Sequence, residues 1–494
     1  EGATCYVGHF AQNVGSIPRD AESSSTVPGD LQISETVPDA IVVSSAVPGN
    51  NVEVLFAREA GIPVYNRSQW LARITKRKAV VAVAGTHGKT TTSSMLSVVM
   101  RENGFDISAL VGGRVRQFPG KANAIGGSDE LFVVEADEYD GAFLGLSPTV
   151  AIITNIDFEH PDMFEDILAV QRSFARFVRR VCDGGCIIAC GDDSNIQRVL
   201  ISQDTAFVTY GFGDQNMWRA VDISTNSAGG SDFSITRTGE KICEVSLPLP
   251  GRHNVLNALA AFIAALALSK ARDGAATGPG PACQLKSFSS LADASAAPVR
   301  CDAPVIAKIV AALEGYKGIA RRMQHVGSIG SCAVYDDYAH HPTAIRAVID
   351  AMRQRFVGSR LVVAFQPHTF SRTAALLPDF AAALVLADRV IIAAVYDARG
   401  EDENSCPSQV SGQDLARLVG VKAVYSDSLR DVRRHLVMEG SLDRGDGSTV
   451  KEVENIRTVF LVLGAGSSNQ LSSVLLASLS TSPSCTSKVI SLGP

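Results

Sequence analysis

The chain has no CxxC pair and no excess of basic residues, and we expect its first residues not to form a signal peptide. Its ten cysteines are scattered, and the Asp-Gly-Gly turn between Cys182 and Cys186 prevents a helical alignment of Cys182, Cys186 and Cys190. We therefore expect buried, reduced thiols rather than disulfides or a metal site. This expectation favours a reducing compartment, either the cytoplasm or, for a eukaryotic source, the plastid stroma.

The net charge argues against a strongly basic protein but excludes few other classes. A net charge of −6 gives no electrostatic reason to expect nucleic acid or an anionic membrane as a partner. We also expect no apolar run long enough to span a bilayer. The chain of 494 residues, 46% of them hydrophobic, is long enough for two or three globular domains. The sequence does not indicate the oligomeric state.

Short apolar runs alternate with helical stretches along most of the chain. Such strands, buried on both faces, predict an α/β fold with parallel sheets covered by helices, which bind ligands at the carboxyl ends of their strands. The predicted strands lie at 40–45, 79–84, 131–136, 150–155, 186–190, 361–366, 389–396 and 459–466. Three segments at 16–39, 273–304 and 438–457 have little periodic apolar surface, and we expect them to be insertions or linkers.

The stretch "AVVAVAGTHGKTTTSSM" (79–95) predicts a strand, a glycine-rich loop and a helix. The usual phosphate-loop pattern fails here because Val83 stands where a glycine or small residue is expected. Gly85 and Gly88 still permit close approach of the backbone to an anion, and the helix that follows offers free N–H groups. Lys89 and Thr90 would then meet the phosphates and Mg²⁺, although an ordinary strand-to-helix turn is the alternative.

Acidic residues follow two other predicted strands. Glu135, Asp137, Glu138 and Asp140 fall within six residues after the strand at 131, and "TNIDFEHP" with His160 follows the strand at 150. Four carboxylates are costly together unless they are solvated or face cations. If both strands neighbour the loop's strand, these groups converge on a cation site; a solvated acidic turn is the alternative.

Basic and polar groups form two further candidate binding sites, at 250–261 and 321–324. "PGRHNVLNALAA" (250–261) places His253 and Asn254 at the start of a long apolar helix, where Asn254 could also serve as an N-cap. "RRMQ" (321–324) contains Arg321 and Arg322, whose guanidinium groups suit phosphate oxygens, although paired arginines are often only solvated.

Two strand ends near the C-terminus also carry functional side chains. "DDYAHHP" (336–342) brings two acids, a tyrosine and two histidines to a junction between a strand and a helix, and "FQPHTFSRT" (365–373) adds His368 and Arg372. Such a concentration of titratable groups at a strand end is typical of a site.

In this order, the motifs resemble those of the Mur ligases of peptidoglycan synthesis, and the resemblance covers nearly the whole chain. It rests on "AGTHGKTTTSSML", "VEADEYDGAFL", "TNIDFEHPDMF", "PGRHNVLNALAA", "RRMQ", "DDYAHHPTAI" and "FQPHTFSRT". The resemblance implies a Rossmann-like N-terminal domain (1–78), a central ATPase domain (79–314) and a Rossmann-like C-terminal domain (315–494). Within the family, "FQPHTFSRT" favours addition of L-alanine to UDP-N-acetylmuramate.

The resemblance also implies roles for particular residues. ATP is expected at Gly85, Thr86, His87, Gly88, Lys89, Thr90, Thr91, His253, Asn254, Arg322 and Asp336. Thr90 and Glu135 are expected to ligate one Mg²⁺, and His160 a second. The sugar nucleotide and amino acid are expected at Tyr338, His340, His341 and Arg372, and the catalytic residues at Lys89, Glu135, His160, Arg322 and His340. His340 is the candidate base for the incoming amine, because imidazole titrates near neutral pH.

The family pattern is not matched everywhere. The resemblance also implies a glycine-rich GxGG turn at the start of the N-terminal domain, and the given residues do not include it. We therefore expect residues 1–78 to be a remnant of that domain, and binding of the UDP-sugar is in question. Thr369 stands where some relatives carry arginine. The alternatives are a family member that attaches a preformed tripeptide, a folate-type polyglutamate ligase, which "DDYAHHP" disfavours, and a paralogue that binds ATP without ligase activity.

Overall fold

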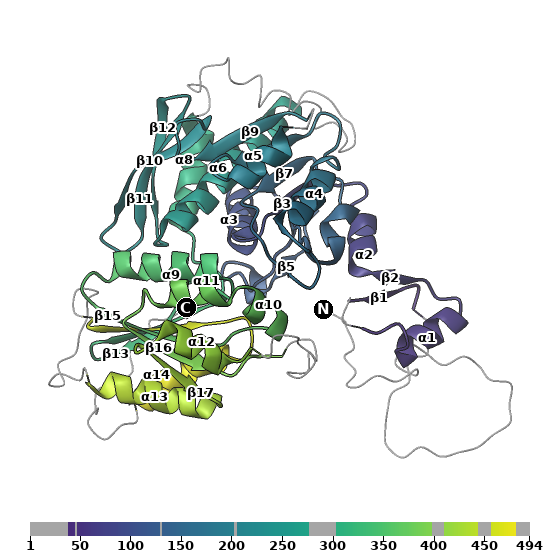
Figure 1. The fold of residues 1–494 in the computed structure, drawn as a ribbon. Coiled ribbons are helices and arrows are strands. Elements are labelled where there is room, and N and C mark those ends of the chain that lie inside the picture. The colour runs from purple at the N-terminus through teal and green to yellow at the C-terminus, as the bar shows by residue number, and fades with distance from the viewer. Residues whose placement is uncertain are drawn as a thin grey trace, which may run out of the picture.

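The computed structural model forms three β-sheets, each associated with helices (Figure 1). It describes residues 38–44, 47–128, 131–201, 205–275, 303–397, 410–442 and 456–480. The first sheet pairs β1 (Ile41–Val43) with β2 (Val64–Asn66) in parallel, beside α1 (Val52–Glu59) and α2 (Arg67–Ile74). We call this part the N-terminal unit. Its helix α2 packs against the short helix η3 (Tyr139–Gly145) of the next unit.

The second sheet organises a larger unit, called the central domain below. Ten strands of the described chain run in the order β12-β11-β10-β9-β8-β7-β3-β6-β4-β5. β3 (Ala79–Ala84) lies between β6 (Leu131–Glu135) and β7 (Val150–Ile153), parallel to both, so the carboxyl ends of these three strands meet. The other strands are β4 (Ser108–Leu110), β5 (Ala124–Ile125), β8 (Cys186–Cys190), β9 (Phe207–Gly211), β10 (Trp218–Thr225), β11 (Ser231–Arg237) and β12 (Glu240–Leu247).

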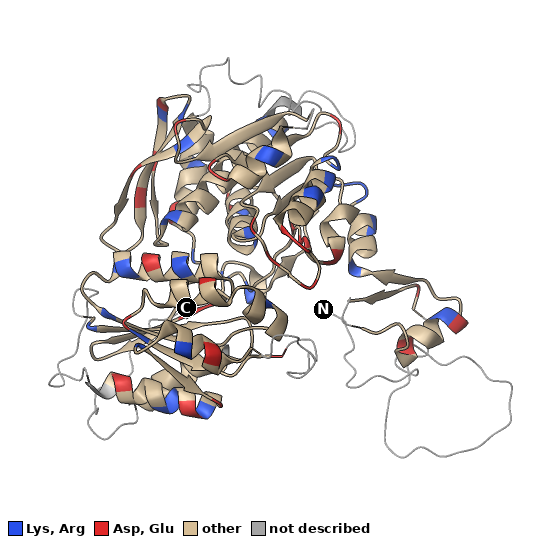
Figure 2. Ribbon diagram, viewed as in Figure 1, with Lys and Arg blue, Asp and Glu red and all other residues tan. Residues whose placement is uncertain are grey.

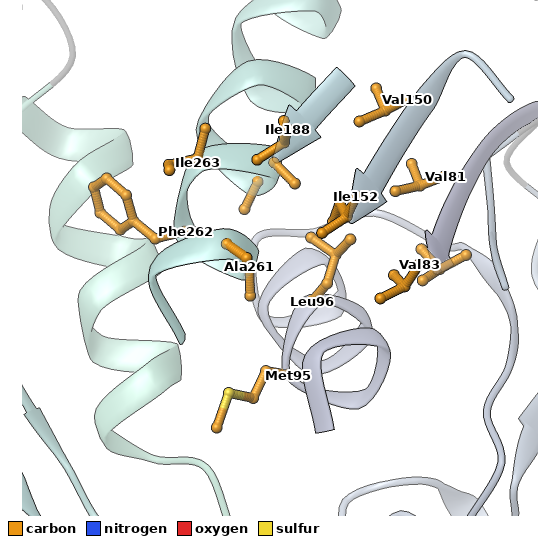
Figure 3. Packing of buried hydrophobic residues seen from close by; sticks show 14 of the residues in the cluster. Val81, Val83, Met95, Leu96, Val150, Ile152, Ile188, Ala261, Phe262 and Ile263 are labelled. Carbon is orange, nitrogen blue, oxygen red and sulfur yellow. The ribbon is translucent and has the colours of Figure 1, made fainter. Parts of the chain in front are cut away.

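The hydrophobic core of the central domain forms between this sheet and its helices. Val81, Val83 and Ile152 on the strands face Leu96 of α3 (Lys89–Glu102) and Ala261 of α6 (Arg252–Ala275) (Figure 3). α8 (Ala303–Glu314) packs against both helices, and α4 (Ile167–Val178) pairs with α5 (Ser194–Leu200). This packing fixes the start of α3 at the end of β3.

The third sheet builds the C-terminal domain, in the order β13-β14-β18-β15-β16-β17. Successive residues of β15 point to opposite faces: Leu361 and Val363 pack under α9 (Pro342–Arg355), and Val362 and Ala364 pack under α13 and α14. The strands are β13 (Gln324–Ile329), β14 (Cys332–Asp337), β15 (Arg360–Phe365), β16 (Arg389–Ala393), β17 (Ala423–Ser426) and β18 (Thr458–Leu463). The other helices are α10 (Phe370–Ala375), α11 (Leu377–Leu384), α12 (Gly412–Val419), α13 (Leu429–Leu442) and α14 (Asn469–Ser480).

Charged side chains of both signs are mixed along the outer helices of the C-terminal domain. In the view of Figure 2, Lys or Arg alternates with Asp or Glu along α9 and α13. Arg434 and Asp431, one turn apart on α13, form an exposed ion pair.

All eight predicted strands are present, and the α/β three-domain fold is confirmed. The predicted strands pair in parallel, as expected, but both larger sheets also contain antiparallel strands that were not predicted: β10, β11 and β12 form an antiparallel meander, and β13 runs antiparallel to β14. Alternating polar residues in 218–247 solvate one face of that meander, and a search for continuous apolar runs passes over such strands.

Three further expectations are corrected or limited. α6 is long and apolar enough to cross a membrane by composition, contrary to the expectation that no such run exists; 83% of its most apolar stretch is buried, so it is a core helix. Residues 273–275, 303–304 and 438–442 are helical rather than part of the insertions, while most of the three predicted insertions lie outside the described residues. Of the five described cysteines, Cys186, Cys190 and Cys332 are buried as expected, whereas Cys243 is half-buried and Cys182 is exposed.

Candidate functional site

A cavity of about 960 Å³ lies where the carboxyl ends of β3, β6 and β7 face the C-terminal domain. Arg67 reaches its lining from α2 of the N-terminal unit. The sequence-predicted residues that line it are Thr86, His87, Gly88, Lys89, Thr90, Thr91, Glu135, His160, His253, Asn254, Arg322, Tyr338, His340, His341 and Arg372. Gly85 lies just behind this surface, and Asp336 lies elsewhere.

The glycine-rich loop is held against the end of β7. Gly85 has φ of +133°, and a Cβ at this position would lie 2.0 Å from Thr154 Oγ1. The His87 N–H donates to Asn155 Oδ1 at 2.8 Å, and Asn155 Nδ2 donates to the His87 carbonyl at 2.9 Å. Gly88 then adopts φ of +82° immediately before α3, so the free N–H groups of the helix start face the cavity.

Lys89 forms a buried ion pair with Glu138 at this helix start. Its Nζ lies 2.6 Å from Glu138 Oε2, and the two side chains are 12% and 2% exposed. Burial raises the pKa of Glu138 to about 7, against the attraction of Lys89. Burial disfavours the ammonium of Lys89, but Glu138 and Asp137 outweigh it and raise the lysine pKa. Lys89 therefore stays charged beside the loop.

Thr90 connects the central domain to the C-terminal domain. Its hydroxyl donates to Glu135 Oε1 at 3.0 Å and accepts from Arg322 Nη2 at 3.2 Å. Gly112 N–H donates to the second oxygen of Glu135 at 2.6 Å, which fixes that carboxylate. Arg321 points the other way and donates to the Gly464 carbonyl at 2.5 Å. The structure thus brings Thr90, Glu135 and Arg322 together.

His160 lies on the opposite side of Glu138 from Lys89. Its Nε2 is 3.8 Å from Glu138 Oε1, and burial lowers its pKa to about 4. Ligand atoms of Asp137, Glu138 and His160 lie within 4.8 Å of one another. Glu138 Oε1 and His160 Nδ1 are buried without a hydrogen-bond partner in the described structure. A carboxylate oxygen with no donor, beside a neutral imidazole, fits a divalent cation.

His253 and Asn254 lie in the first turn of α6 at the cavity wall. Asn254 Nδ2 donates to the Pro250 carbonyl at 2.8 Å, so Asn254 folds back inside the helix start instead of capping it. Burial lowers the pKa of His253 to about 4, which keeps its imidazole neutral.

Tyr338 and His340 follow β14 on the other wall of the cavity. The Tyr338 ring lies 4.9 Å from the guanidinium carbons of both Arg321 and Arg322. His340 Nδ1 donates to the Tyr338 carbonyl at 2.9 Å, because a carbonyl only accepts. Burial, reinforced by Arg372, holds the His340 pKa well below its usual value. His340 is therefore neutral at working pH, and the reason for expecting it to titrate there is wrong.

Arg372 is a buried cation shared between the two domains. Its Nε donates to Glu159 Oε1 of the central domain at 2.6 Å, and Nη1 donates to His368 Nδ1 at 3.0 Å. Burial alone would raise the Glu159 pKa, but Arg372 and nearby histidines lower it. Thr369, where some relatives have arginine, caps α10 by accepting from Arg372 N–H.

Two predicted residues have other contacts than expected. Asp336 and Asp337 point to opposite faces of β14, and Asp337 is the one that lines the cavity. Asp336 instead lies near Arg321 and accepts from Ser472. His341 is the N-cap of α9: its Nδ1 accepts from Thr343 N–H, and its Nε2 donates to the Phe158 carbonyl.

Four further carboxylates shape the site. Asp137 and Glu138 were expected within the acidic group after the strand at 131, but without individual roles, and Asp157 and Glu159 of "TNIDFEHP" were not singled out. Their position after a strand was readable from the sequence, but only the fold shows which cation each one faces.

A phosphate-binding loop at the edge of a parallel sheet, facing a second α/β domain across one cavity, defines a multidomain enzyme that uses a nucleotide. Models of one protein family match three successive segments of the chain. The model of the Mur ligase middle domain matches residues 83–265, that of the Mur ligase glutamate ligase domain matches 321–446, and that of the Mur ligase family catalytic domain matches 1–79.

Individual relatives agree with these models. A UDP-N-acetylmuramate–L-alanine ligase of Frankia casuarinae is 37% identical over 458 residues, covering 86% of this chain and 82% of the relative. One of Oleidesulfovibrio alaskensis is 35% identical over 468 residues, covering 94% and 87%. The crystal structure of the UDP-N-acetylmuramate–alanine ligase of Thermotoga maritima is 25% identical, with a TM-score of 0.65 over 89% of this chain and 85% of that one. The chain belongs to the Mur ligase family, whose members are ATP-dependent ligases.

We expect Gly85→Ala to damage the phosphate loop. The added Cβ would collide with Thr154 Oγ1 and come within 3.0 Å of the Asn155 carbonyl, at a φ that L-residues avoid. The free energy of unfolding should fall by about 2 kcal/mol or more, and ATP should bind more weakly in calorimetry. Gly126→Ala is the control, because nothing lies within 4 Å of its Cβ position. Equal effects of the two substitutions would contradict this account of the loop.

His253 predicts a pH dependence of stability. The unfolded imidazole takes up a proton below pH 6.5, whereas the folded one stays neutral down to about pH 4. The free energy of unfolding should therefore fall as the pH drops through this window, with His253 contributing about 2 kcal/mol. Urea titrations at pH 7 and pH 4.5 should show a smaller loss for His253→Gln than for the wild type. His435→Gln, on α13, should keep the wild-type loss.

Proposed function

We propose that the protein joins L-alanine to the lactyl carboxylate of UDP-N-acetylmuramate, using ATP, through an acyl phosphate. The names of the relatives that cover most of the chain support these substrates. This activity belongs to the synthesis of a peptidoglycan precursor, and we place it in the cytoplasm.

One observation carries the proposal. The cavity has a phosphate loop at one end and a neutral imidazole with a buried guanidinium at the other, and Arg322 reaches Thr90 between them. A nucleotide at Lys89 and a carboxylate substrate beside it would therefore lie within one enclosed volume. Such an arrangement suits transfer of a phosphoryl group between two anions.

The first step forms the acyl phosphate. An oxygen of the substrate carboxylate attacks the γ-phosphorus, the bond to the β,γ-bridging oxygen breaks, and ADP leaves. Two anions approach each other, so positive charge must be fixed in advance. Lys89 and Arg322 supply it from opposite domains, and the amides at the start of α3 add to it.

Magnesium is expected to contribute further positive charge. Thr90 and Glu135 are the residues we propose for one Mg²⁺, and His160 with Glu138 for the second. When bound, Mg²⁺ supplies neutralisation of the phosphate oxygens.

The second step forms the amide. The alanine nitrogen attacks the acyl carbon as the unprotonated amine, and the tetrahedral intermediate expels inorganic phosphate, which takes up the proton that the nitrogen loses. We propose that Arg372 binds the alanine carboxylate and that Tyr338 and His340 line the same end. The neutral His340 keeps Nδ1 on the Tyr338 carbonyl, so Nε2 can accept a hydrogen bond from the amine. With its low pKa, His340 orients the amine but is a weak base.

Attachment of a tripeptide is the second candidate within the family. The structure of a murein peptide ligase of Psychrobacter arcticus has the same fold, with a TM-score of 0.60 at 22% identity. That likeness concerns the fold alone, whereas the relatives that share a third or more of their residues are alanine ligases.

A coupled assay of ADP release tests the proposal. With UDP-N-acetylmuramate and Mg²⁺-ATP, release should depend on L-alanine and should be much slower with the tripeptide L-Ala-γ-D-Glu-diaminopimelate. Lys89→Met removes the fixed charge at the phosphates and should lower kcat by at least about a hundredfold. Lys121→Met, outside the cavity, should leave the rate unchanged. Faster turnover with the tripeptide, or ADP release without any acceptor, would overturn the proposal.

A further inference from the structure

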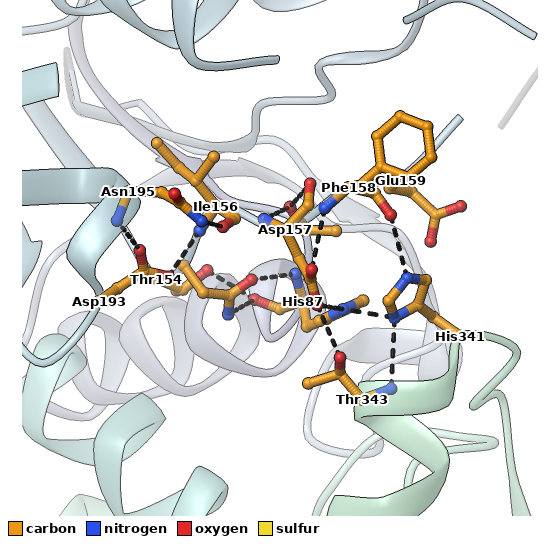
Figure 4. A network of polar contacts seen from close by, with 12 residues as sticks. His87, Thr154, Ile156, Asp157, Phe158, Glu159, Asp193, Asn195, His341 and Thr343 are labelled. Atoms are coloured by element: carbon orange, nitrogen blue, oxygen red, sulfur yellow. Dashed lines mark hydrogen bonds and ion pairs between the residues drawn. The ribbon is translucent and has the colours of Figure 1, made fainter. Parts of the chain in front are cut away.

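The start of α9 makes direct contact with the segment that follows β7, at one edge of the cavity. Thr343 Oγ1 donates to Asp157 Oδ2 at 2.6 Å, and His341 Nε2 donates to the Phe158 carbonyl at 3.1 Å (Figure 4). The rings of His341 and His87 lie against each other with centroids 4.6 Å apart and their planes tilted by 39°. The C-terminal domain therefore touches the phosphate loop itself, through His87, and the residue beside it, Asp157.

Asp157 is also tied to the loop from within the central domain. Its N–H donates to Thr86 Oγ1 at 2.8 Å, and its Oδ2 lies 3.6 Å from His87 Nε2. The nearby His87 imidazole and the hydrogen bond from Thr343 lower the Asp157 pKa against the effect of burial, so the carboxylate is ionised. An unbroken chain of contacts thus runs from Thr343 on α9, through Asp157, to Thr86 and His87 in the loop.

The composition of this cluster also raises the question of a metal. His87, Asp157 and His341 offer ligand atoms within 4.8 Å of one another. However, the lone pairs that a cation would use on His341 Nδ1 and on Asp157 Oδ2 already accept hydrogen bonds from Thr343. His87 Nε2, 3.6 Å from Asp157 Oδ2, is buried without a hydrogen-bond partner in the described structure. Two of the three candidate ligand residues are thus already engaged in the contact between domains.

We propose that Asp157 and His87 are positioning residues that couple docking of the C-terminal domain to the conformation of the phosphate loop. Docking places Thr343 on Asp157, and Asp157 then holds Thr86 and His87 in the arrangement that presents the loop amides and Lys89. Without that contact, the loop keeps its bonds to Asn155 but loses the brace from α9. This inference rests on the proposed function, since it assigns the brace to phosphoryl transfer from ATP.

Helix α9 offers a matched pair of variants for the test. Thr343→Val removes the hydroxyl that binds Asp157 and keeps the shape of the side chain. Arg355→Met, at the other end of α9, removes a bond from Arg355 Nη1 to the Gly229 carbonyl at 3.2 Å. That bond also joins the two domains, but it lies on the β10–β11 turn, away from the loop. Thr343→Ser restores the hydroxyl and tests for rescue.

Amide hydrogen exchange of the ATP-bound protein measures the protection of the loop's backbone amides directly. It needs no ligase activity. We expect Thr343→Val to exchange faster over residues 85–91, while Arg355→Met and Thr343→Ser exchange there like the wild type. In the ADP-release assay, Thr343→Val should lower kcat by about tenfold with little change in the KM for ATP, and serine should restore it.

The outcomes separate the two proposals. Unchanged loop exchange in Thr343→Val, or equal increases in Thr343→Val and Arg355→Met, would overturn the coupling, and so would failure of serine to restore the loop. Absence of alanine-dependent turnover in the wild type would instead contradict the proposed function, and the exchange measurement would still decide the coupling. Thermal unfolding of each variant identifies any general loss of stability.

Discussion

The site depends on a lysine and a glutamate that are almost removed from water at the end of β3. Taking either charge out of water alone costs several kcal/mol, so each requires the other. The 2.6 Å contact between Lys89 and Glu138 is possible only because β6 lies next to β3, which brings the turn after β6 to the start of α3. The order of strands is therefore a condition for a charged lysine at this position.

The same constraint explains why the other acids gather here. Glu135 ends β6 and is fixed by Thr90 and Gly112, whereas Glu138 makes the direct contact with Lys89. One carboxylate oxygen of Glu138 contacts Lys89. The other has no hydrogen-bond donor in the described structure and faces His160. An anion that enters at the loop meets an ammonium that is already ionised, and a cation that enters meets an oxygen that is already desolvated. The electrostatic field is thus in place before either ligand binds.

Three contacts between domains complete the cavity. Arg322 reaches Thr90, Arg372 reaches Glu159, and α9 reaches Asp157 and Phe158. In each case the central-domain residue stands just after β3 or β7, which are neighbours in the sheet. In these three contacts the C-terminal domain therefore reaches the nucleotide end where strand ends converge. This geometry makes its position a determinant of the chemistry as well as a boundary of the pocket.

Much of the fold could be predicted because its strands are continuous apolar runs, a pattern that a doubly covered parallel sheet imposes. The β10–β12 meander was missed because one of its faces is solvated and its residues alternate. The residue types of the site, and their positions at strand ends, could be predicted from the sequence. For two adjacent residues, however, the sequence does not show which side chain faces the cavity. Asp336 was chosen where Asp337 faces the cavity, since a shift of one residue on a strand reverses the side chain. His340 was given a titrating role because sequence does not report burial.

Backbone strain explains how two neighbouring arginines can serve different domains. Arg321 and Met323 adopt φ of +60° and +46°, in the left-handed region that costs such residues about 1 kcal/mol or more each. These two residues flank Arg322, and the reversals direct Arg321 to the Gly464 carbonyl and Arg322 to Thr90. Asp337 secures the distortion by accepting from Met323 N–H at 2.6 Å. A regular strand would also send adjacent arginines to opposite faces, but it would not turn the chain between the two sheets. The strain is therefore the local cost of placing one cation of the C-terminal domain at the phosphate end of the central one.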